Sequence, residues 1–210
     1  MNRPLRLDQF TPAEAREKLR AAGRLLIPVG TLEFRAAHLP LGCDSILVER
    51  LADDLSARNA IPRAPMIPVG VHGRREPLAP GVAALSRKTL HRVMNELIAS
   101  WEEGAGVEES IILTAHAAEA HIEALSTIRA LGTVRVVDIL AFDFSGHLEL
   151  ADAPVHGGEL DTSLMLYLAP ELIRDADAVA RLRASSEKGA RIHDYIVEQV
   201  EARWLRPPTP

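Results

Sequence analysis

The chain has 210 residues, of which 47% are hydrophobic and 25% are charged, and its formal net charge is −5. This composition is typical of a soluble globular domain and excludes fibrous, collagen-like and wholly disordered proteins. A protein that wraps a nucleic-acid duplex needs a basic face, so the acidic balance argues against nucleic acid as a partner.

The sequence predicts one cytoplasmic domain. The single cysteine, Cys43, excludes an internal disulfide and suits a reducing compartment. We find no apolar stretch of signal-peptide length near the start and no run near the roughly 18 apolar residues of a membrane span, so we expect no membrane partner. With no repeat or linker to divide the chain, we expect one domain over residues 1–206 and a frayed, proline-rich tail over 207–210.

Helical and apolar segments alternate in the first half of the chain. Thr11 and Glu14 have the spacing of a capping box, with Pro12 at the first helical position, and Gly23 stands where that helix would end. The apolar run at 25–29 predicts a strand that is buried on both faces. The alternation continues with a helix predicted at 44–59, a strand at 66–71 and a helix at 86–104.

The second half repeats this alternation. We predict strands at 111–113 and 134–140, helices at 117–131 and around 164–168, a weak connection from 170 to 183, and a final amphipathic helix at 186–204. Short apolar strands that alternate with helices indicate an α/β fold, in which a mostly parallel sheet lies between helix layers.

In such a sheet, ligands bind beyond the carboxyl ends of the strands, where the strand-to-helix loops gather. This rule selects the segments that follow Val29, Val71, Leu113 and Leu140. The loops carry TLEFRAAHLPLGCD at 31–44, TAHAAE at 114–119 and HGGELDTS at 156–163. They bring together carboxylates and imidazoles, which are the ligands of zinc, manganese and iron sites in hydrolases.

Each of these residues also has a simpler explanation. Asp44 suits the start of a helix, and Glu33 suits a solvated loop. A histidine such as His116 at the end of a strand is often only hydrogen-bonded, and Glu159 can complement a helix dipole in its first turn. Their joint placement at one predicted sheet edge is what favours a site.

The same motifs carry a resemblance to a known family. LIPVGTLEFRAAHLPLGCD resembles the creatininase signature PvGSxEqHGpHLPlgtD, LTAHAAEA lies where the family has NGHGGN, and HGGELDTSLML lies where it has HaGexETSlml. Together with weaker matches at APGVAAL and SSEKGARI, the resemblance covers most of residues 24–195.

This resemblance implies a three-layer α/β/α sandwich and a metal-dependent amidohydrolase. The substrate class it implies is a small non-peptide or cyclic amide or a formamide, and the assembly is a homo-oligomer, commonly a hexamer. The positions that match family metal ligands are Glu33, Arg35, Asp44, His116 and Glu159.

Arg35 breaks the pattern, because it stands where the family has a metal-binding histidine. A guanidinium stays protonated and has no lone pair to donate, so it cannot be a ligand. Its fixed positive charge would also repel a neighbouring cation. We therefore expect one divalent cation (zinc, iron or manganese) rather than two, held by Glu33, Asp44 and His116, with Glu159 released from a second site.

The central motif also departs from the family. Ala115, Ala117 and Ala118 replace glycines, which reshapes the backbone beside the substrate. Glu119 replaces an asparagine, either as a substitute ligand or base at the substrate or as an ordinary first-turn helix acid. In the preceding loop, Glu76 lies near the place of a family histidine.

The resemblance and the residue chemistry together suggest catalytic roles. A bound cation would lower the pKa of a water molecule, and Glu159 would accept its proton. Arg35 would stabilise the oxyanion or pair with a substrate carboxylate. His156 and His38 would orient groups or move protons beside the substrate, although His38 is equally explained as a buried structural histidine.

Three hypotheses follow. The first is a hydrolase of a small-molecule amide with one cation per chain. The second is a catalytically silent family member that acts in binding or assembly, in which Arg35 pairs with Asp44 and Glu159 and no metal enters. The third is a dinuclear hydrolase in which Glu119 replaces the lost histidine.

Overall fold

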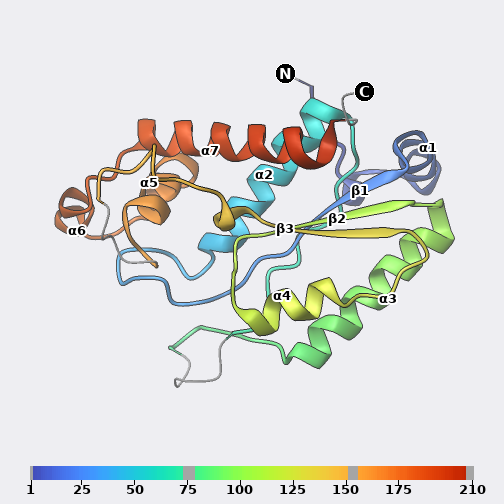
Figure 1. Cartoon of the computed structure of the whole chain (residues 1–210), viewed down its shortest axis with the longest axis horizontal. Helices are drawn as coiled ribbons and strands as arrows, with labels where there is room; N and C mark the ends of the chain where they lie inside the picture. The colour runs from blue at the N-terminus through green and yellow to red at the C-terminus, as the bar shows by residue number, and fades with distance from the viewer. Residues whose placement is uncertain (1, 73–78, 151–155, 207–210) are drawn as a thin grey trace.

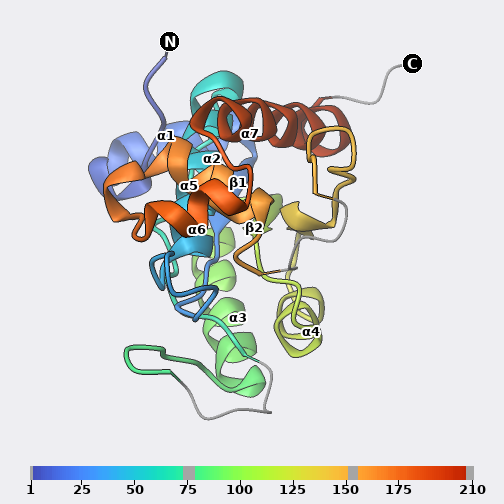
Figure 2. The same cartoon turned by 90° about the vertical axis from the view of Figure 1, so that its left-hand side faces the viewer.

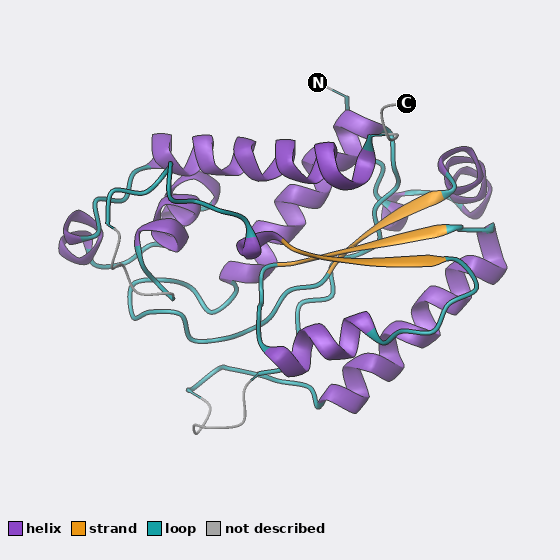
Figure 3. Cartoon of the chain, viewed as in Figure 1, coloured by secondary structure: helices purple, strands orange, loops and turns teal. Residues whose placement is uncertain are grey.

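The computed structural model describes residues 2–72, 79–150 and 156–206, so Glu76 and the predicted tail at 207–210 lie outside the described residues. The described residues form one sheet of three parallel strands with helices on both faces (Figure 1, Figure 3). The strands, in spatial order, are β1 (Arg24–Pro28), β2 (Glu109–Thr114) and β3 (Thr133–Asp138). This confirms the predicted α/β class and the parallel sheet between helix layers.

Alternation along the strands builds a separate core on each face of the sheet. Leu26 of β1 and Leu113 of β2 point to one face, whereas Leu25 and Ile112 point to the other. The first face packs against α2 (Cys43–Asn59), α5 (Glu159–Leu168) and α7 (Ser186–Val200). The second face packs against α1 (Pro12–Ala22), α3 (Arg87–Ala105) and α4 (Glu119–Ser126). In the side view, α3 and α4 lie at the bottom and α7 at the top (Figure 2).

The strand predicted at 66–71 is absent from the described residues. Instead, residues 61–67 run beside β1 and make isolated hydrogen bonds with it, such as Ala64 N–H to the carbonyl of Leu26. Pro65 and Pro68 have no N–H to donate, so a continuous ladder cannot form along this edge. The segment still delivers Val71 to the sheet edge where β1 and β2 end.

Most predicted helices are confirmed, with different ends. The capping box is present, since Thr11 accepts from the backbone N–H of Glu14 and the Glu14 carboxylate accepts from that of Thr11. The helix predicted at 117–131 is shorter, as α4, and the connection from 170 to 183 contains short helices. The short elements are Leu7–Gln9, Ile139–Ala141, Pro170–Leu172, α6 (Ala176–Arg181) and the π-helical turn Glu201–Leu205 after α7.

Close packing of α5 against α7 depends on Gly189. A Cβ atom at this position would overlap the backbone carbonyl of Ser163 in α5. We expect Gly189→Ala to lower the free energy of unfolding by about 1–3 kcal/mol, the usual cost of overpacking. Urea unfolding measures this, with Gly104→Ala as the matched control.

Gly104 lies in α3, and a Cβ there would meet nothing within 4 Å among the described residues. The control should therefore be neutral or stabilising by up to about 1 kcal/mol, because alanine favours the helix more than glycine does. Equal effects of the two substitutions would contradict the packing argument.

The loops that carry the predicted site gather at one edge of the sheet. All three strands are parallel, so their carboxyl ends at Pro28, Thr114 and Asp138 lie together (Figure 1). Across residues 2–72, 79–150 and 156–206, every helix is too short or too polar to cross a bilayer.

Candidate metal centre

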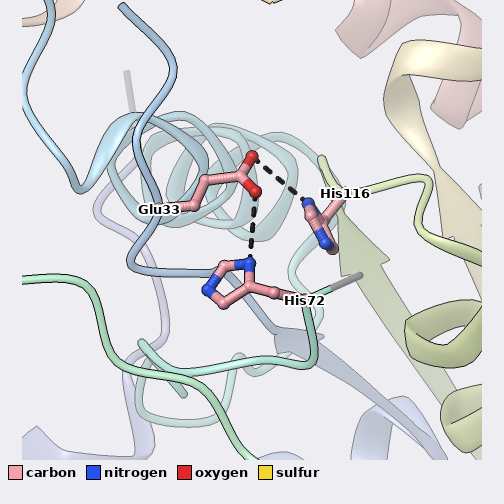
Figure 4. Close-up of side chains that lie close together, drawn as sticks. All are labelled: Glu33, His72 and His116. Atoms are coloured by element: carbon pink, nitrogen blue, oxygen red, sulfur yellow. Dashed lines mark ion pairs between the residues drawn. The ribbon is translucent and has the colours of Figure 1, made fainter. Parts of the chain in front are cut away.

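Three side chains from three loops converge beyond this edge. Glu33 follows β1, His72 follows the proline-rich segment, and His116 follows β2. Their ligand atoms all lie within 4.8 Å of one another (Figure 4). Nδ1 of His72 is 3.2 Å from Oε2 of Glu33, and Nδ1 of His116 is 3.3 Å from Oε1. The carboxylate therefore lies between two imidazole nitrogens.

The far sides of both rings are occupied by backbone carbonyls. Nε2 of His116 lies 3.0 Å from the carbonyl oxygen of Val71. Nε2 of His72 lies 3.2 Å from that of Leu32 and 3.3 Å from that of Ala83. A carbonyl only accepts, so each Nε2 carries a proton and donates. In the neutral rings, both Nδ1 atoms then hold free lone pairs that face Glu33, which is the tautomer that metal-binding histidines use.

Two facing atoms of this cluster are buried and unsatisfied. Within the described part of the chain, neither Oε1 of Glu33 nor Nδ1 of His116 makes a hydrogen bond. Buried polar atoms without partners are rare, because each costs about 1–3 kcal/mol. A cation bound between a carboxylate oxygen and imidazole nitrogens would satisfy both, so these residues fit a divalent metal ion.

Arg35 fills the space beside this cluster. Its side chain is 2% exposed. Both terminal nitrogens of the guanidinium make hydrogen bonds, whereas Nε is only in ion-pair contact with Oε1 of Glu33. Nε lies 3.0 Å from the Glu33 carboxylate, Nη2 lies 2.5 Å from Asp44, and Nη1 lies 3.2 Å from Asp161. The remaining partners are the carbonyl of Ala115 and Nδ1 of His156, both at 2.9 Å.

The charges around Arg35 favour one divalent ion. Glu33, Asp44 and Asp161 carry three negative charges against the single positive charge of Arg35. With neutral histidines, these groups keep an excess of two negative charges in a buried site. One divalent cation matches that excess, and burying such a charge unpaired would be costly.

The pKa values of Glu33 and His116 reflect the charges around them. Burial raises the pKa of Glu33, but His116 and Arg35 outweigh it and bring the pKa to about 2. Burial lowers the pKa of His116, but the carboxylates of Asp44 and Glu33 outweigh it and raise the pKa to about 9. A proton on His116 therefore occupies the position that a cation would take.

Asp44 stands beside the donors rather than among them. It lies in the first turn of α2, where Gly42 is the N-cap, so its side chain does not cap the helix. Oδ1 accepts from Arg35, and Oδ2 accepts from the hydroxyl of Thr31 at 2.5 Å. Oδ2 is also 3.5 Å from Nδ1 of His116.

The structure places Glu159 in a different cluster from the one predicted. Its buried carboxylate pairs with Nζ of Lys188 and accepts from the backbone N–H groups of Glu149 and Leu150. Asp161, two residues further along α5, is the acid that reaches Arg35 instead. The HGGELDTS motif thus reaches the site through Asp161 and His156.

The Glu159–Lys188 pair predicts a pH dependence of stability. Burial raises the pKa of Glu159, but Lys188 and the backbone N–H groups outweigh it and hold the pKa below its ordinary value. A carboxyl with a lowered folded-state pKa stabilises the fold above its unfolded pKa, and this contribution is lost as the pH falls through the folded pKa.

We therefore expect Glu159→Gln to cost about 3–5 kcal/mol at pH 7, as for a broken buried pair. The cost should shrink below about pH 4.3, the unfolded pKa of a glutamate, because the wild type then loses the same contribution. Urea unfolding at pH 7 and pH 4 measures both. A cost that stays constant over this range would contradict the ion pair.

The other predicted residues lie around the cluster. His38 is buried, and its Nε2 is 2.9 Å from the hydroxyl of Thr162 in α5. Glu119 is the exposed first residue of α4. His156 is exposed, and its Nδ1 faces Arg35. Of the predicted residues, the structure brings Glu33, Arg35, Asp44, His116 and His156 together.

Sequence reasoning missed His72 and Asp161. His72 is the first residue of the segment after Val71, which the rule for parallel sheets predicts to be a site loop. That rule could therefore have identified His72. Asp161 lies in the same HGGELDTS motif as Glu159, so the motif offered two acids as candidates. Which of these two acids faces the site depends on the rotation of α5, which helical periodicity alone does not determine.

Comparison with known proteins identifies the family. The sequence model of the creatininase family, described as creatinine amidohydrolase, matches residues 8–204. The chain belongs to the creatininase family. The resemblance inferred from the motifs is therefore confirmed over most of the chain.

Relatives of this creatininase-family chain are distant in sequence. It is 24% identical over 183 residues to the 3-dehydro-scyllo-inosose hydrolase of Thermotoga maritima, with 81% of this chain and 58% of the relative covered. The chain thus spans less than two thirds of that relative's length.

Solved creatininases share its fold. A crystal structure of creatinine amidohydrolase superposes with a TM-score of 0.77 at 20% identity, covering 98% of this chain and 99% of that one. A creatininase described as Mn gives 0.77 at 18% identity, covering 97% and 100% of the two chains. A creatininase variant described as Zn-Zn type gives 0.79 at 19% identity, covering 97% and 99%.

Proposed function

We propose that this chain is a metal-dependent hydrolase of a small amide, with one divalent cation held by Glu33, His72 and His116. The observation that carries the proposal is the convergence of two Nδ1 lone pairs on one carboxylate, with both Nε2 atoms fixed by backbone carbonyls. Three protein donors with an open position form the donor set of catalytic zinc sites. The set differs from the one predicted from sequence in that His72 takes the place of Asp44.

The position of Arg35 supports one cation per chain rather than two. Its guanidinium lies among Asp44, Asp161 and His156, which are themselves acids and an imidazole suited to hold a second cation. A permanent positive charge there supplies part of what a second cation would supply, and it repels that cation. Arg35 would thus have a fixed electrostatic role, since each of its nitrogens lies within 3.2 Å of a protein acceptor.

The remaining side chains have chemical roles consistent with hydrolysis. A bound divalent cation lowers the pKa of a coordinated water molecule towards 7 and polarises a carbonyl. Oδ2 of Asp44 accepts from Thr31 and lies 3.5 Å from Nδ1 of His116, so it is the acid beside the donors that would take up a proton released at the site. Glu159 pairs with Lys188 and accepts from two backbone N–H groups, so we do not propose it as the general base.

His156 acts as a hydrogen-bond donor in this proposal. The guanidinium of Arg35 can only donate, so Nδ1 of His156 accepts and the neutral ring carries its proton on Nε2. The ring is exposed, which leaves Nε2–H available to a substrate. A donor fixed in this way stabilises the oxyanion of a tetrahedral intermediate.

The number of metal ions per chain tests this proposal. Elemental analysis of protein purified without chelators, and of protein reconstituted separately with zinc, manganese and iron, should give about one ion per chain for a three-donor site. A content near two supports a dinuclear hydrolase, and a content near zero after reconstitution contradicts the proposal. A screen of small amides, formamides and lactams against the loaded protein then tests the substrate class.

The contacts of Arg35 also support a second candidate function. A guanidinium that pairs with the buried Asp44 and Asp161 and the half-buried Glu33 fills the place of a family ligand, as expected for a silent member that acts in binding or assembly. The two candidates differ in what Nδ1 of His116 carries: a cation in the hydrolase, and a proton paired with Glu33 in the silent member. A homo-oligomer, which light scattering would detect, is part of either proposal.

A further inference from the structure

His121 touches both segments that carry the histidine donors. It lies in α4, fully buried, and is outside the donor set. Its Nδ1 is 3.2 Å from the backbone nitrogen of Val71, and its Nε2 is 3.0 Å from the hydroxyl of Thr114. Val71 precedes His72, and Thr114 lies two residues before His116. One imidazole thus links the ends of both loops.

The hydrogen bonds of His121 fix its tautomer. The backbone N–H of Val71 can only donate, so Nδ1 of His121 accepts, and the proton of the neutral ring is on Nε2, facing Thr114. His121 is therefore a donor at one end and an acceptor at the other.

Val71 is held from both sides by imidazoles. His121 accepts from its N–H, and its carbonyl accepts from Nε2 of His116. The bond from His116 to this carbonyl is what turns Nδ1 of His116 towards Glu33. A shift of Val71 would move the acceptor of His116 and the backbone of His72 together.

The packing leaves this network little freedom. The rings of His116 and His121 meet edge to face, with centroids 5.1 Å apart and planes at 88°. Gly70 allows the close approach, because a Cβ there would lie 2.6 Å from Cε1 of His121 and 2.7 Å from Cγ2 of Thr31. The segment that ends at His72 is thus pressed against the His121 ring without an intervening side chain.

We propose that His121 is a positioning residue that holds Val71 so that His72 and His116 both direct Nδ1 at Glu33. The inference rests on the proposed cation site, and it assigns the affinity of that site in part to a residue that is not itself one of the three donors. Positioning contacts to metal-binding histidines typically change metal affinity by about 10–100-fold.

Three variants separate hydrogen bonding from shape. His121→Phe keeps a ring but removes both bonds, and His121→Gln can still accept from Val71 and donate to Thr114. Thr114→Val keeps a similar side-chain volume but removes the hydroxyl that bonds His121. It therefore tests the hydrogen bond even if His121→Phe does not fold. The control is His91→Phe, because His91 bonds the carbonyl of Ala124 between α3 and α4, away from the site.

Competition of zinc with a chromophoric chelator measures the affinity of each variant. We expect a loss of about 10–100-fold for His121→Phe, as for other lost positioning contacts, with a smaller loss in Thr114→Val. His121→Gln should recover most of the affinity, and His91→Phe should match the wild type. Wild-type affinity in a folded His121→Phe, or equal losses in the Phe and Gln variants, would overturn the proposal.

An imidazole NMR experiment on metal-free protein separates this inference from the proposed function. The Nε2 proton of His116 bonded to Val71 should give a protected signal in the wild type, which is lost in His121→Phe and retained in His121→Gln. A protected signal that persists in His121→Phe overturns the positioning role. Failure of the wild type to take up zinc would instead contradict the proposed function.

Discussion

Replacing His116 by alanine should reduce the bound metal from about one ion per chain to near zero and abolish hydrolysis. His116 supplies a lone pair at Nδ1, which lies 3.3 Å from Glu33 and 3.5 Å from Asp44. With His116 removed, Glu33 and His72 are left as the only donors of the proposed set. Two ligands rarely hold a divalent ion against water at micromolar concentrations.

The measurement is elemental analysis and zinc competition on the purified variant, with thermal unfolding to show that it folds. His91→Ala is the matched control, since it removes an imidazole that bonds the carbonyl of Ala124 in α4 and is outside the donor set. Retention of the wild-type metal content by His116→Ala would exclude the site that we propose. Retention of metal with loss of activity would assign His116 to catalysis alone.

Replacing Arg35 by methionine should lower the free energy of unfolding by about 3–5 kcal/mol at pH 7, the cost of leaving buried charges without their partner. The side chains of Arg35 and Asp44 are each 2% exposed, so solvent cannot replace the lost contact. Asp44, Asp161 and Glu33 would then face one another without a central cation. Methionine has a similar volume, which separates the charge effect from a cavity effect.

Arg92→Met is the matched control. Arg92 pairs with Glu96 one turn away on α3, but the two side chains are 82% and 70% exposed. Removing such a surface pair should change the stability by no more than about 1 kcal/mol. Equal effects of the two substitutions in urea unfolding would contradict a structural role for the Arg35 cluster.

Arg35→His adds a test of the metal number. A histidine at this position faces Asp44, Asp161 and His156, which now hold the guanidinium. If Arg35 excludes a second cation by its charge, the variant should gain metal, towards about two ions per chain, because carboxylates and imidazoles form a donor set. A metal content equal to that of the wild type would show that the charge of Arg35 does not set the number.

Much of the fold follows from the sequence because burial sets the pattern along the chain. The runs at 25–29 and 111–113 are apolar and become part of the buried strands β1 and β2, whereas the mostly apolar run at 134–140 becomes part of the edge strand β3, which is half exposed. The run at 66–71 fails for a local reason, since Pro65 and Pro68 cannot donate to a ladder. Helix ends were less predictable, because α4 stops at Ser126 although its apolar pattern continues.

The sequence alone determined the fold class, the family and the edge of the sheet where the site lies. It also determined that Arg35 is not a ligand, because the chemistry of a guanidinium does not depend on its surroundings. Only the tertiary structure decided which acids and imidazoles meet. His72 joins Glu33 and His116, Asp161 rather than Glu159 reaches Arg35, and His121 fixes Val71. These outcomes depend on loop paths and helix rotation, which long-range packing sets and local sequence patterns do not encode.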